Sequence, residues 1–267
     1  MNDSNWEWYS NHRESQQNAG LKLLSLWTDD WGNGDTVLDI GCGTGDLTKM
    51  IAERDNVKSV IGVDISANAI EFASKNNSVD GKTQYLVGDA MRLPETFSHF
   101  EKAFTKVYCN EALHWMEDKQ TVLRNAFWCL KETGSFLFHA NRVKNPFYNV
   151  YYKSIELPKW MKYLKDFQPK YCPILGSLED LNDMIAHCGF KKYPRTVERY
   201  RYSFSADTKD KHIGFLRPLM AHLDFIPASL HEDFLEDCFQ IFQRASTKTE
   251  DGVLHWSFEG FQVKLYK

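Results

Sequence analysis

The sequence lacks the features that mark several large classes of protein. Its 267 residues contain no uncharged apolar run long enough to span a membrane, which needs about 18 residues or more. The first residues, MNDSNWEWYSNHRES, are polar and have no apolar stretch like that of a signal peptide. No basic cluster stands out and the net charge is −4, so we expect no nucleic-acid partner.

The spacing of the cysteines excludes a common type of metal site. The six cysteines are Cys42, Cys109, Cys129, Cys172, Cys188 and Cys238, and no two of them stand at CxxC spacing, so we expect no zinc ribbon. No carboxylate–histidine cluster stands at ligand spacing either, and we expect no metal. The cysteines scatter through apolar runs, as buried free thiols do. This pattern favours a reducing compartment, and we expect a cytoplasmic protein.

What the sequence has is a regular alternation of strand and helix patterns between Thr36 and Ala140. The expected strands are 36–40, 58–64, 83–88, 103–109 and 135–140, and the expected helices are 14–28, 46–54, 67–76 and 118–131. Ser66 is a plausible N-cap for the helix that follows it. The alternation predicts a parallel sheet with right-handed crossovers.

After residue 140 the alternation lapses. Residues 143–176 mix four prolines with many aromatic residues and read as a lid, and 207–250 as a second lid or cap insertion. The expected elements are a helix at 178–188, a strand at 195–204, two helices in 209–245 broken at Ile226-Pro227, and a final strand at 253–266, single or bent at Gly260. We therefore expect one α/β domain: a Rossmann-like, seven-stranded, mostly parallel sheet with helices on both faces and a helical lid.

A glycine-rich loop follows the first predicted strand. Gly41, Gly43 and Gly45 are spaced G-x-G-x-G, and Asp46 stands where a G-x-G-x-x-G dinucleotide fingerprint has its last glycine. Such glycines let the backbone turn tightly and approach a ligand closely at a helix N-terminus. Asp39 precedes the loop. A carboxylate there would repel a pyrophosphate, but it suits a ligand with an ammonium group, such as the methionine part of S-adenosylmethionine (SAM).

Further polar residues follow the next strands. Asp64 ends the second strand, where a carboxylate can accept hydrogen bonds from both ribose hydroxyls. Asp89 and the backbone amide of Ala90 follow the third strand and could hold adenine, while Asn110 would flank the methionine moiety. The ordinary alternatives are a helix cap for Asp64 and a surface loop for Asp89. The expected cofactor-binding set is Asp39, Gly41, Cys42, Gly43, Gly45, Asp64, Ile65, Asp89, Ala90 and Asn110.

Three motifs in this order resemble the class I SAM-dependent methyltransferase family. They are VLDIGCGTGDLT, GVDIS and GDAMRLP, and the resemblance covers roughly residues 36–140. It implies a Rossmann-like fold, SAM as the cofactor and methyl transfer as the reaction, and it identifies 36–140 as the SAM-binding core.

A second resemblance concerns the methyl acceptor. The N-terminal run from Tyr9 to Gln16, the segment CNEALHW at 109–115 and the cap-forming insertions look like the juvenile hormone acid O-methyltransferases of arthropods. These enzymes esterify farnesoic acid or its epoxide. In that family a glutamine of the first helix and the tryptophan of an LHW-type motif hold the substrate carboxylate, and Gln16 and Trp115 are the matching positions. The resemblance implies a small lipophilic carboxylic acid as substrate.

The chemistry of these two residues suits that role. The Gln16 amide and the Trp115 indole are uncharged donors, which can orient a carboxylate without strongly quenching its nucleophilicity. A free carboxylic acid has a pKa near ~4 and is ionised at neutral pH, so no general base is required. The chain departs from the family at Ala19, where an acidic residue is usual, and Gln17 offers a second amide next to Gln16.

Two other interpretations stay open at this point. A methyltransferase acting on nitrogen, carbon or a hydroxyl of another metabolite would use His114 and Glu111 as acid–base groups. A non-catalytic SAM-binding protein would keep the glycine loop without turnover. The sequence carries no signal of oligomeric state.

Overall fold

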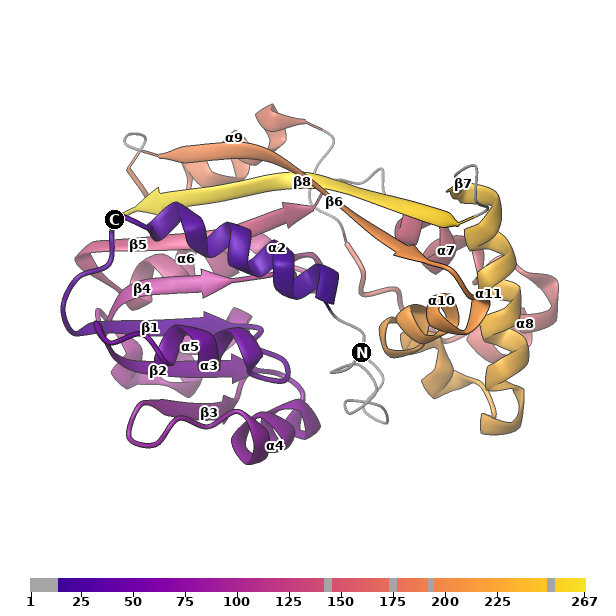
Figure 1. Ribbon diagram of the computed structural model, residues 1–267, viewed down its shortest axis with the longest axis horizontal. Coiled ribbons are helices and arrows are strands. Elements are labelled where there is room, and N and C mark those ends of the chain that lie inside the picture. Colours follow the sequence, from indigo (N-terminus) through magenta and orange to yellow (C-terminus); the bar gives the residue numbers. More distant parts are fainter. Residues whose placement is uncertain (1–13, 142–145, 173–176, 192–194, 249–252) are drawn as a thin grey trace.

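The computed structural model describes residues 14–141, 146–172, 177–191, 195–248 and 253–267. Its centre is one sheet with the strand order β3-β2-β1-β4-β5-β8-β6 (Figure 1). The strands are β1 (Asp35–Ile40), β2 (Val57–Asp64), β3 (Thr83–Val87), β4 (Phe104–Cys109), β5 (Leu130–Asn141), β6 (Thr196–Ala206) and β8 (Leu254–Tyr266), and the short β7 (Thr247–Lys248) pairs with β8. All pairs from β3 to β5 are parallel, whereas β8 runs antiparallel to β5 and β6. The predicted Rossmann-like, mostly parallel sheet is confirmed.

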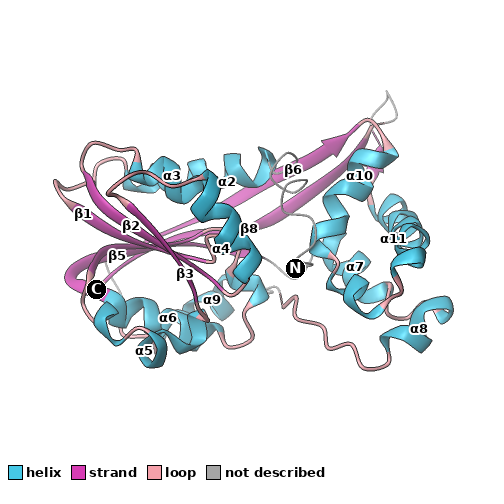
Figure 2. Ribbon diagram, turned by 90° about the horizontal axis from the view of Figure 1, so that it is seen from below, coloured by secondary structure: helices cyan, strands magenta, loops and turns pink. Residues whose placement is uncertain are grey.

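Helices cover both faces of the sheet (Figure 2). They are α2 (Glu14–Leu24), α3 (Asp46–Ala52), α4 (Ala67–Asn76), α5 (Leu93–Thr96), α6 (Lys119–Cys129), α7 (Pro146–Lys153), α8 (Pro158–Leu164), α9 (Leu178–Ala186), α10 (Lys209–Leu216) and α11 (His231–Ala245). Because side chains alternate along a strand, Val37 and Tyr108 pack with Trp27 beside α2 and α3. Leu38 and Val107 face the opposite way and pack with α6 and α9.

Strands β6 and β8 continue beyond the rest of the sheet to a second group of helices (Figure 1). We call α7, α8, α10 and α11 the cap helices. They enclose a hydrophobic cluster of their own, which contains Trp160, Phe234, Phe242 and Trp256. Trp256 lies on β8 and its indole N–H donates to Ser246 Oγ at 2.7 Å, so a strand of the sheet is built into the cap. The boundaries expected for the core and the two lid insertions stay predictions.

The helix expected over 14–28 ends at Leu24, and α5, α7 and α8 lie where the sequence analysis expected no individual helix. The remaining expected helices mostly agree, and two further differences have a local cause. Ser66 caps α4 as expected, accepting from the amide of Ala69 at 3.3 Å. The helix expected to reach residue 131 ends at Cys129, because Leu130 already pairs as the first residue of β5. In the segment 209–226, α10 ends at Leu216, and residues 217–230 form three 3₁₀ turns. Pro218 has no N–H to continue the α-helical bonds.

The last strand is single, and Gly260 does not bend it. Gly260 pairs with Asn141 on one side and Tyr200 on the other. A Cβ at Gly260 would lie 2.6 Å from the carbonyl oxygen of Ala140 and 2.7 Å from the ring of Tyr200. Glycine is therefore required for close packing at this position, and it lets the Tyr200 ring pass over β8.

Candidate active site

The loop between β1 and α3 turns through left-handed backbone at its three glycines. The φ angles are 72° at Gly41, 53° at Gly43 and 79° at Gly45, values that residues with a Cβ rarely adopt. A Cβ at Gly41 would collide with Ala112, in the loop after β4, and one at Gly45 would lie 2.7 Å from the hydroxyl of Tyr85. At Gly43 the same position has no atom within 4 Å, which leaves its backbone open to a ligand.

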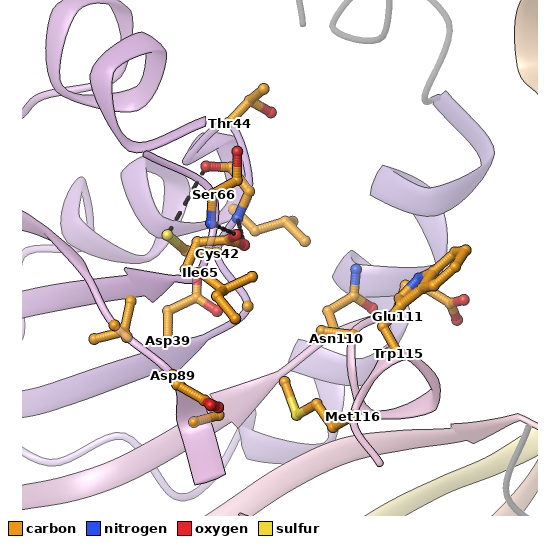
Figure 3. A pocket seen from close by; sticks show the side chains of 18 of the residues that line it. Asp39, Cys42, Thr44, Ile65, Ser66, Asp89, Asn110, Glu111, Trp115 and Met116 are labelled. Atoms are coloured by element: carbon orange, nitrogen blue, oxygen red, sulfur yellow. Dashed lines mark hydrogen bonds between the residues drawn. The ribbon is translucent and has the colours of Figure 1, made fainter. Parts of the chain in front are cut away.

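A cavity of about 370 Å³ opens beside this loop, a size usual for small-molecule sites. In Figure 3 Cys42, Ile65 and Asp89 lie on one side of it, and Asn110 and Trp115 on the other. It lies outside the carboxyl ends of β1 and β4, where the strand order reverses and where open α/β sheets bind ligands. The lining residues are Gln17, Asp39, Gly41, Cys42, Gly43, Thr44, Asp46, Leu47, Val63, Asp64, Ile65, Ser66, Gly88, Asp89, Ala90, Met91, Asn110, Glu111, Ala112, Trp115, Met116, Tyr151, Lys170 and Ala221.

The cavity brings together most of the residues singled out from the sequence. Asp39, Gly41, Cys42, Gly43, Asp64, Ile65, Asp89, Ala90, Asn110 and Trp115 all line it. Gly45 is not among the lining residues, because it packs against Tyr85 at the base of the turn. The side chain of Gln16 lies outside the described part of the chain. Its neighbour Gln17 lines the cavity, with its Nε2 3.9 Å from the sulfur of Met50. The binding roles of these residues stay proposals.

Asp64 is held rigidly at the end of β2. Its Oδ2 accepts from the amide of Gly43 and its Oδ1 from the amide of Ser66, both at 2.9 Å. A carboxylate has about four acceptor positions, so these bonds orient Asp64 and leave capacity for ribose hydroxyls. Ile65, next in the chain, is 71% exposed although it is apolar. Its side chain offers the cavity a surface for a flat ring.

Asp39 is the buried carboxyl of the site, with 2% of its surface exposed. Burial raises its pKa to about 7 and the charge of Asp64 raises it too, against the lowering effect of the hydrogen bond from Thr48. That bond joins Thr48 Oγ1 to Asp39 Oδ2 at 2.6 Å. A cationic group bound nearby would favour the ionised form, whereas a pyrophosphate would be repelled.

Side-chain bonds also fix the loop after β3. Asp89 Oδ1 accepts from the amide of Met91 at 2.8 Å and caps a 3₁₀ turn. Asn125 of α6 donates from its Nδ2 to the carbonyl of Ala90 at 2.8 Å. Asp89 and Ala90 are therefore positioned at the cavity before any ligand binds.

A buried polar network, which the sequence analysis missed, supports the loop after β4. Glu111 has a φ of 50°, unusual for a residue with a side chain. Its Oε1 lies 2.6 Å from the hydroxyl of Tyr200, its Oε2 accepts from Asn141 Nδ2 at 2.9 Å, and His139 Nδ1 lies 3.3 Å away. Tyr200 and Asn141 come from β6 and β5. No local pattern connects them with residues 109–115, and only the pairing of both strands with β8 brings them together.

His114 is poorly placed to act as a general base. Its side chain is buried, and this burial lowers its pKa to about 3. Its Nδ1 lies 3.0 Å from Asn141 Nδ2, and because an amide nitrogen donates, the imidazole accepts there and is neutral. His114 is also absent from the described residues that line the cavity.

Trp115 connects the cavity with the cap. Its ring centroid lies 5.0 Å from that of Tyr171, 6.0 Å from Tyr151 and 6.2 Å from Phe147. Within the described chain its indole N–H has no hydrogen-bond acceptor. The cap side contributes Tyr151, Lys170 and Ala221 to the lining. Burial raises the pKa of Tyr151 to about 12, so its hydroxyl is uncharged at neutral pH.

The donor and acceptor set of this cavity fits SAM better than a dinucleotide. Asp39 suits an ammonium group, and Gly43 allows a ligand to approach the backbone closely. Asp64 suits ribose hydroxyls, and Ile65 suits the face of a purine ring. The lining carboxylates would repel a pyrophosphate, and the loop has Asp46 at the place of a further glycine. SAM bound here would supply an electrophilic methyl group on a sulfonium.

Comparison with known proteins agrees with this assignment. Residues 38–138 match the model of a methyltransferase domain family. The fold is similar to that of phosphoethanolamine N-methyltransferase 2 from Haemonchus contortus, solved in complex with SAM, with a TM-score of 0.56 at 18% identity. The match covers 94% of this chain and 52% of that one. The matched domain, the fold and the lining of the cavity together support a SAM-dependent methyltransferase.

Within this class its sequence resembles juvenile hormone acid O-methyltransferases. It is 29% identical to the enzyme of Drosophila melanogaster, over 80% of this chain and 72% of that protein. It is 25% identical to the enzyme of Bombyx mori, over 78% of this chain and 74% of that protein. Among the described residues no helix is long and apolar enough to cross a membrane, and no cluster of His, Cys, Asp or Glu side chains could hold a metal ion.

The first prediction concerns Asp64. Asp64→Asn keeps one oxygen but removes the charge that strengthens hydrogen bonds from ribose hydroxyls, so we expect binding of S-adenosylhomocysteine (SAH) to weaken roughly tenfold. Titration calorimetry measures this, with Asp55→Asn in an exposed turn as the matched control. A variant that melts normally and binds SAH with unchanged affinity would remove Asp64 from the site.

The second prediction concerns pH. Because the Asp39 pKa is raised from 3.8 to about 7, the ligand-free folded chain holds a proton that the unfolded chain releases, and its stability should fall as pH rises between these values. SAH carries an ammonium group that favours ionised Asp39, so its affinity should rise toward pH 7 and level off above it. Asp39→Asn should flatten both profiles in thermal melts and calorimetry. A wild-type affinity independent of pH would refute the pairing.

Proposed function

We propose that this enzyme is a carboxyl O-methyltransferase that converts a lipophilic carboxylic acid, such as farnesoic acid or a juvenile hormone acid, to its methyl ester. Trp115 is the observation that carries the proposal, since it offers an uncharged N–H donor without an acceptor among the described residues, inside the cavity that fits SAM. The similarity to the two insect enzymes supports it. The six cysteines are all free, which supports a cytoplasmic location.

The surroundings of Trp115 suit an acceptor with an apolar body. Phe147, Tyr151 and Tyr171 contact its ring, and all three belong to the hydrophobic cluster of the cap helices. An acid with a hydrocarbon chain can place its carboxylate at the indole N–H and its chain against Tyr151, which lines the cavity.

The burial of His114 also favours a carboxylic acid. Amines and alcohols must lose a proton during methyl transfer, and the neutral, buried His114 is not positioned to take it. A carboxylate is already ionised near neutral pH. The contribution left to the protein is alignment of the attacking oxygen and exclusion of water, and alignment alone contributes up to about 7–11 kcal/mol in the best intramolecular cases.

A glutamine amide is proposed as the second donor to the carboxylate. Gln16 is the position indicated by the sequence resemblance, while Gln17 is the glutamine that lines the cavity. Both belong to α2, which Trp27 secures to the sheet by donating from its indole N–H to Ser135 Oγ at 2.9 Å.

The third prediction tests the activity. With labelled SAM and a panel of lipophilic acids, alcohols and amines, we expect transfer to the acids alone, with methyl esters as products. Between about pH 6 and 8 the acceptor stays ionised and should add no pH dependence to the rate. Transfer to an amine or alcohol with none to any acid would overturn the proposal, and SAH binding without any product would indicate a non-catalytic protein.

The fourth prediction concerns the indole N–H. Trp115→Phe keeps an aromatic ring and deletes the donor, and a hydrogen bond to a charged group contributes about 1.5–3 kcal/mol. We therefore expect kcat/KM for the acid to fall roughly ten- to a hundredfold, while SAH affinity stays the same. Trp128→Phe, on the outer helix α6, is the matched control. An unchanged kcat/KM would show that the indole plays no part in holding the carboxylate.

A further inference from the structure

The charges around the cavity are strongly unequal. Asp39, Asp46, Asp64, Asp89 and Glu111 are the acidic residues of its lining. Lys170 is the one lysine or arginine among the described lining residues. An acidic surface suits a cationic cofactor, but it raises the free energy of bringing an anionic acceptor into the same space. A carboxylate acceptor therefore needs a compensating positive charge on the side of the cavity away from the glycine loop.

Lys170 belongs to that side. It follows α8 in the chain, and with Tyr151 and Ala221 it makes up the part of the lining that the cap contributes. It is exposed, and within the described chain its ammonium forms no ion pair or hydrogen bond. A lysine whose charge is not used by the fold is available to a ligand.

The backbone next to Lys170 is fixed beside Trp115. The ring of Tyr171 packs 5.0 Å from that of Trp115, and the Tyr171 carbonyl accepts from the hydroxyl of Tyr152 at 2.7 Å. The amide of Cys172 donates to the carbonyl of His114 at 2.8 Å. Lys170 and the indole N–H thus belong to two segments that are joined directly to each other.

We propose that Lys170 is a specificity residue that binds the carboxylate of the acceptor together with Trp115 and selects anionic acceptors over alcohols and esters. The inference rests on the proposed function, because it assigns the charge partner of the same acceptor. A carboxylate has two oxygens, so one can be held by these donors while the other attacks the methyl group. The flexible stem of lysine lets the ammonium follow the acceptor as it enters.

The cofactor has a carboxylate of its own, so Lys170 could meet this chemistry from two sources. Separate binding measurements with SAH and with the acid distinguish these two sources. If Lys170 binds the acceptor, its removal leaves SAH affinity unchanged and weakens binding of the acid to the SAH-loaded protein. If it binds the cofactor, SAH affinity falls and binding of the acid to SAH-loaded protein does not.

The fifth prediction compares Lys170→Met with Lys170→Arg, using Lys165→Met, an exposed lysine at the end of α8, as the control. For Lys170→Met we expect about a three- to tenfold higher KM and Kd for the acid, little change in kcat, and unchanged SAH affinity. Lys170→Arg should restore most of the affinity. The wild-type KM should rise with salt because the ion pair is partly exposed, and that of Lys170→Met should not.

Two results would overturn the inference and leave the proposed function intact: a wild-type KM for the acid in Lys170→Met, or a loss confined to SAH binding. If the wild-type enzyme methylates no carboxylic acid at all, the proposed function fails first. Calorimetry with farnesoic acid and farnesol on SAH-loaded protein then still decides the charge preference. Equal binding of both compounds by wild type and Lys170→Met would overturn the role of Lys170.

Discussion

The site depends on how closely the backbone after β1 can approach the backbone after β4. Gly41 lies so near Ala112 that a side chain of any kind would push the two loops apart, and its φ of 72° rules out most other residues. The first loop holds Gly41, Cys42 and Gly43 of the expected cofactor-binding set, and the other holds Asn110 and Trp115. The absence of a Cβ at Gly41 therefore sets how closely the two loops approach each other. Alignment, the main contribution expected from this protein, begins with that contact.

A second glycine, Gly260, allows the contacts that connect the site with the cap. Gly260 on β8 lets the Tyr200 ring reach over the strand to Glu111 and Asn141, and these bonds hold the loop after β4 from beneath. Tyr200 belongs to β6, and β6 continues to the cap, where α10 follows it. The loop that carries Trp115 is thus attached to the sheet through Glu111 and to the cap through the ring of Tyr171.

Local signals were sufficient to predict which residues gather on the glycine-loop side of the cavity. Alternating strands and helices place successive strand ends at one edge of a sheet, so Asp39, Asp64 and Asp89 had to gather there once the sheet was parallel. Tyr200 and Asn141 carry no comparable signal in the sequence. They come into contact only because β5 and β6 both pair with β8. Lys170 was missed for a related reason. A lysine in a proline-rich segment resembles any solvated lysine until the fold shows which cavity it borders.

The two ends of the cavity also differ in what the reaction does to charge. With a carboxylate acceptor, an anion and a sulfonium enter, and a neutral ester and a neutral thioether leave. The acidic residues beside the glycine loop and Lys170 on the cap therefore favour the reactants over the products, each at its own end. Once the methyl group has moved, the ester keeps only its apolar contacts with the rings around Trp115. These apolar contacts would slow the release of a lipophilic ester. Because the ester is neutral, it lacks the ion pair with Lys170 that the acid forms, and it is therefore bound more weakly than the acid. The same unused charge that selects the acid also helps to release the ester.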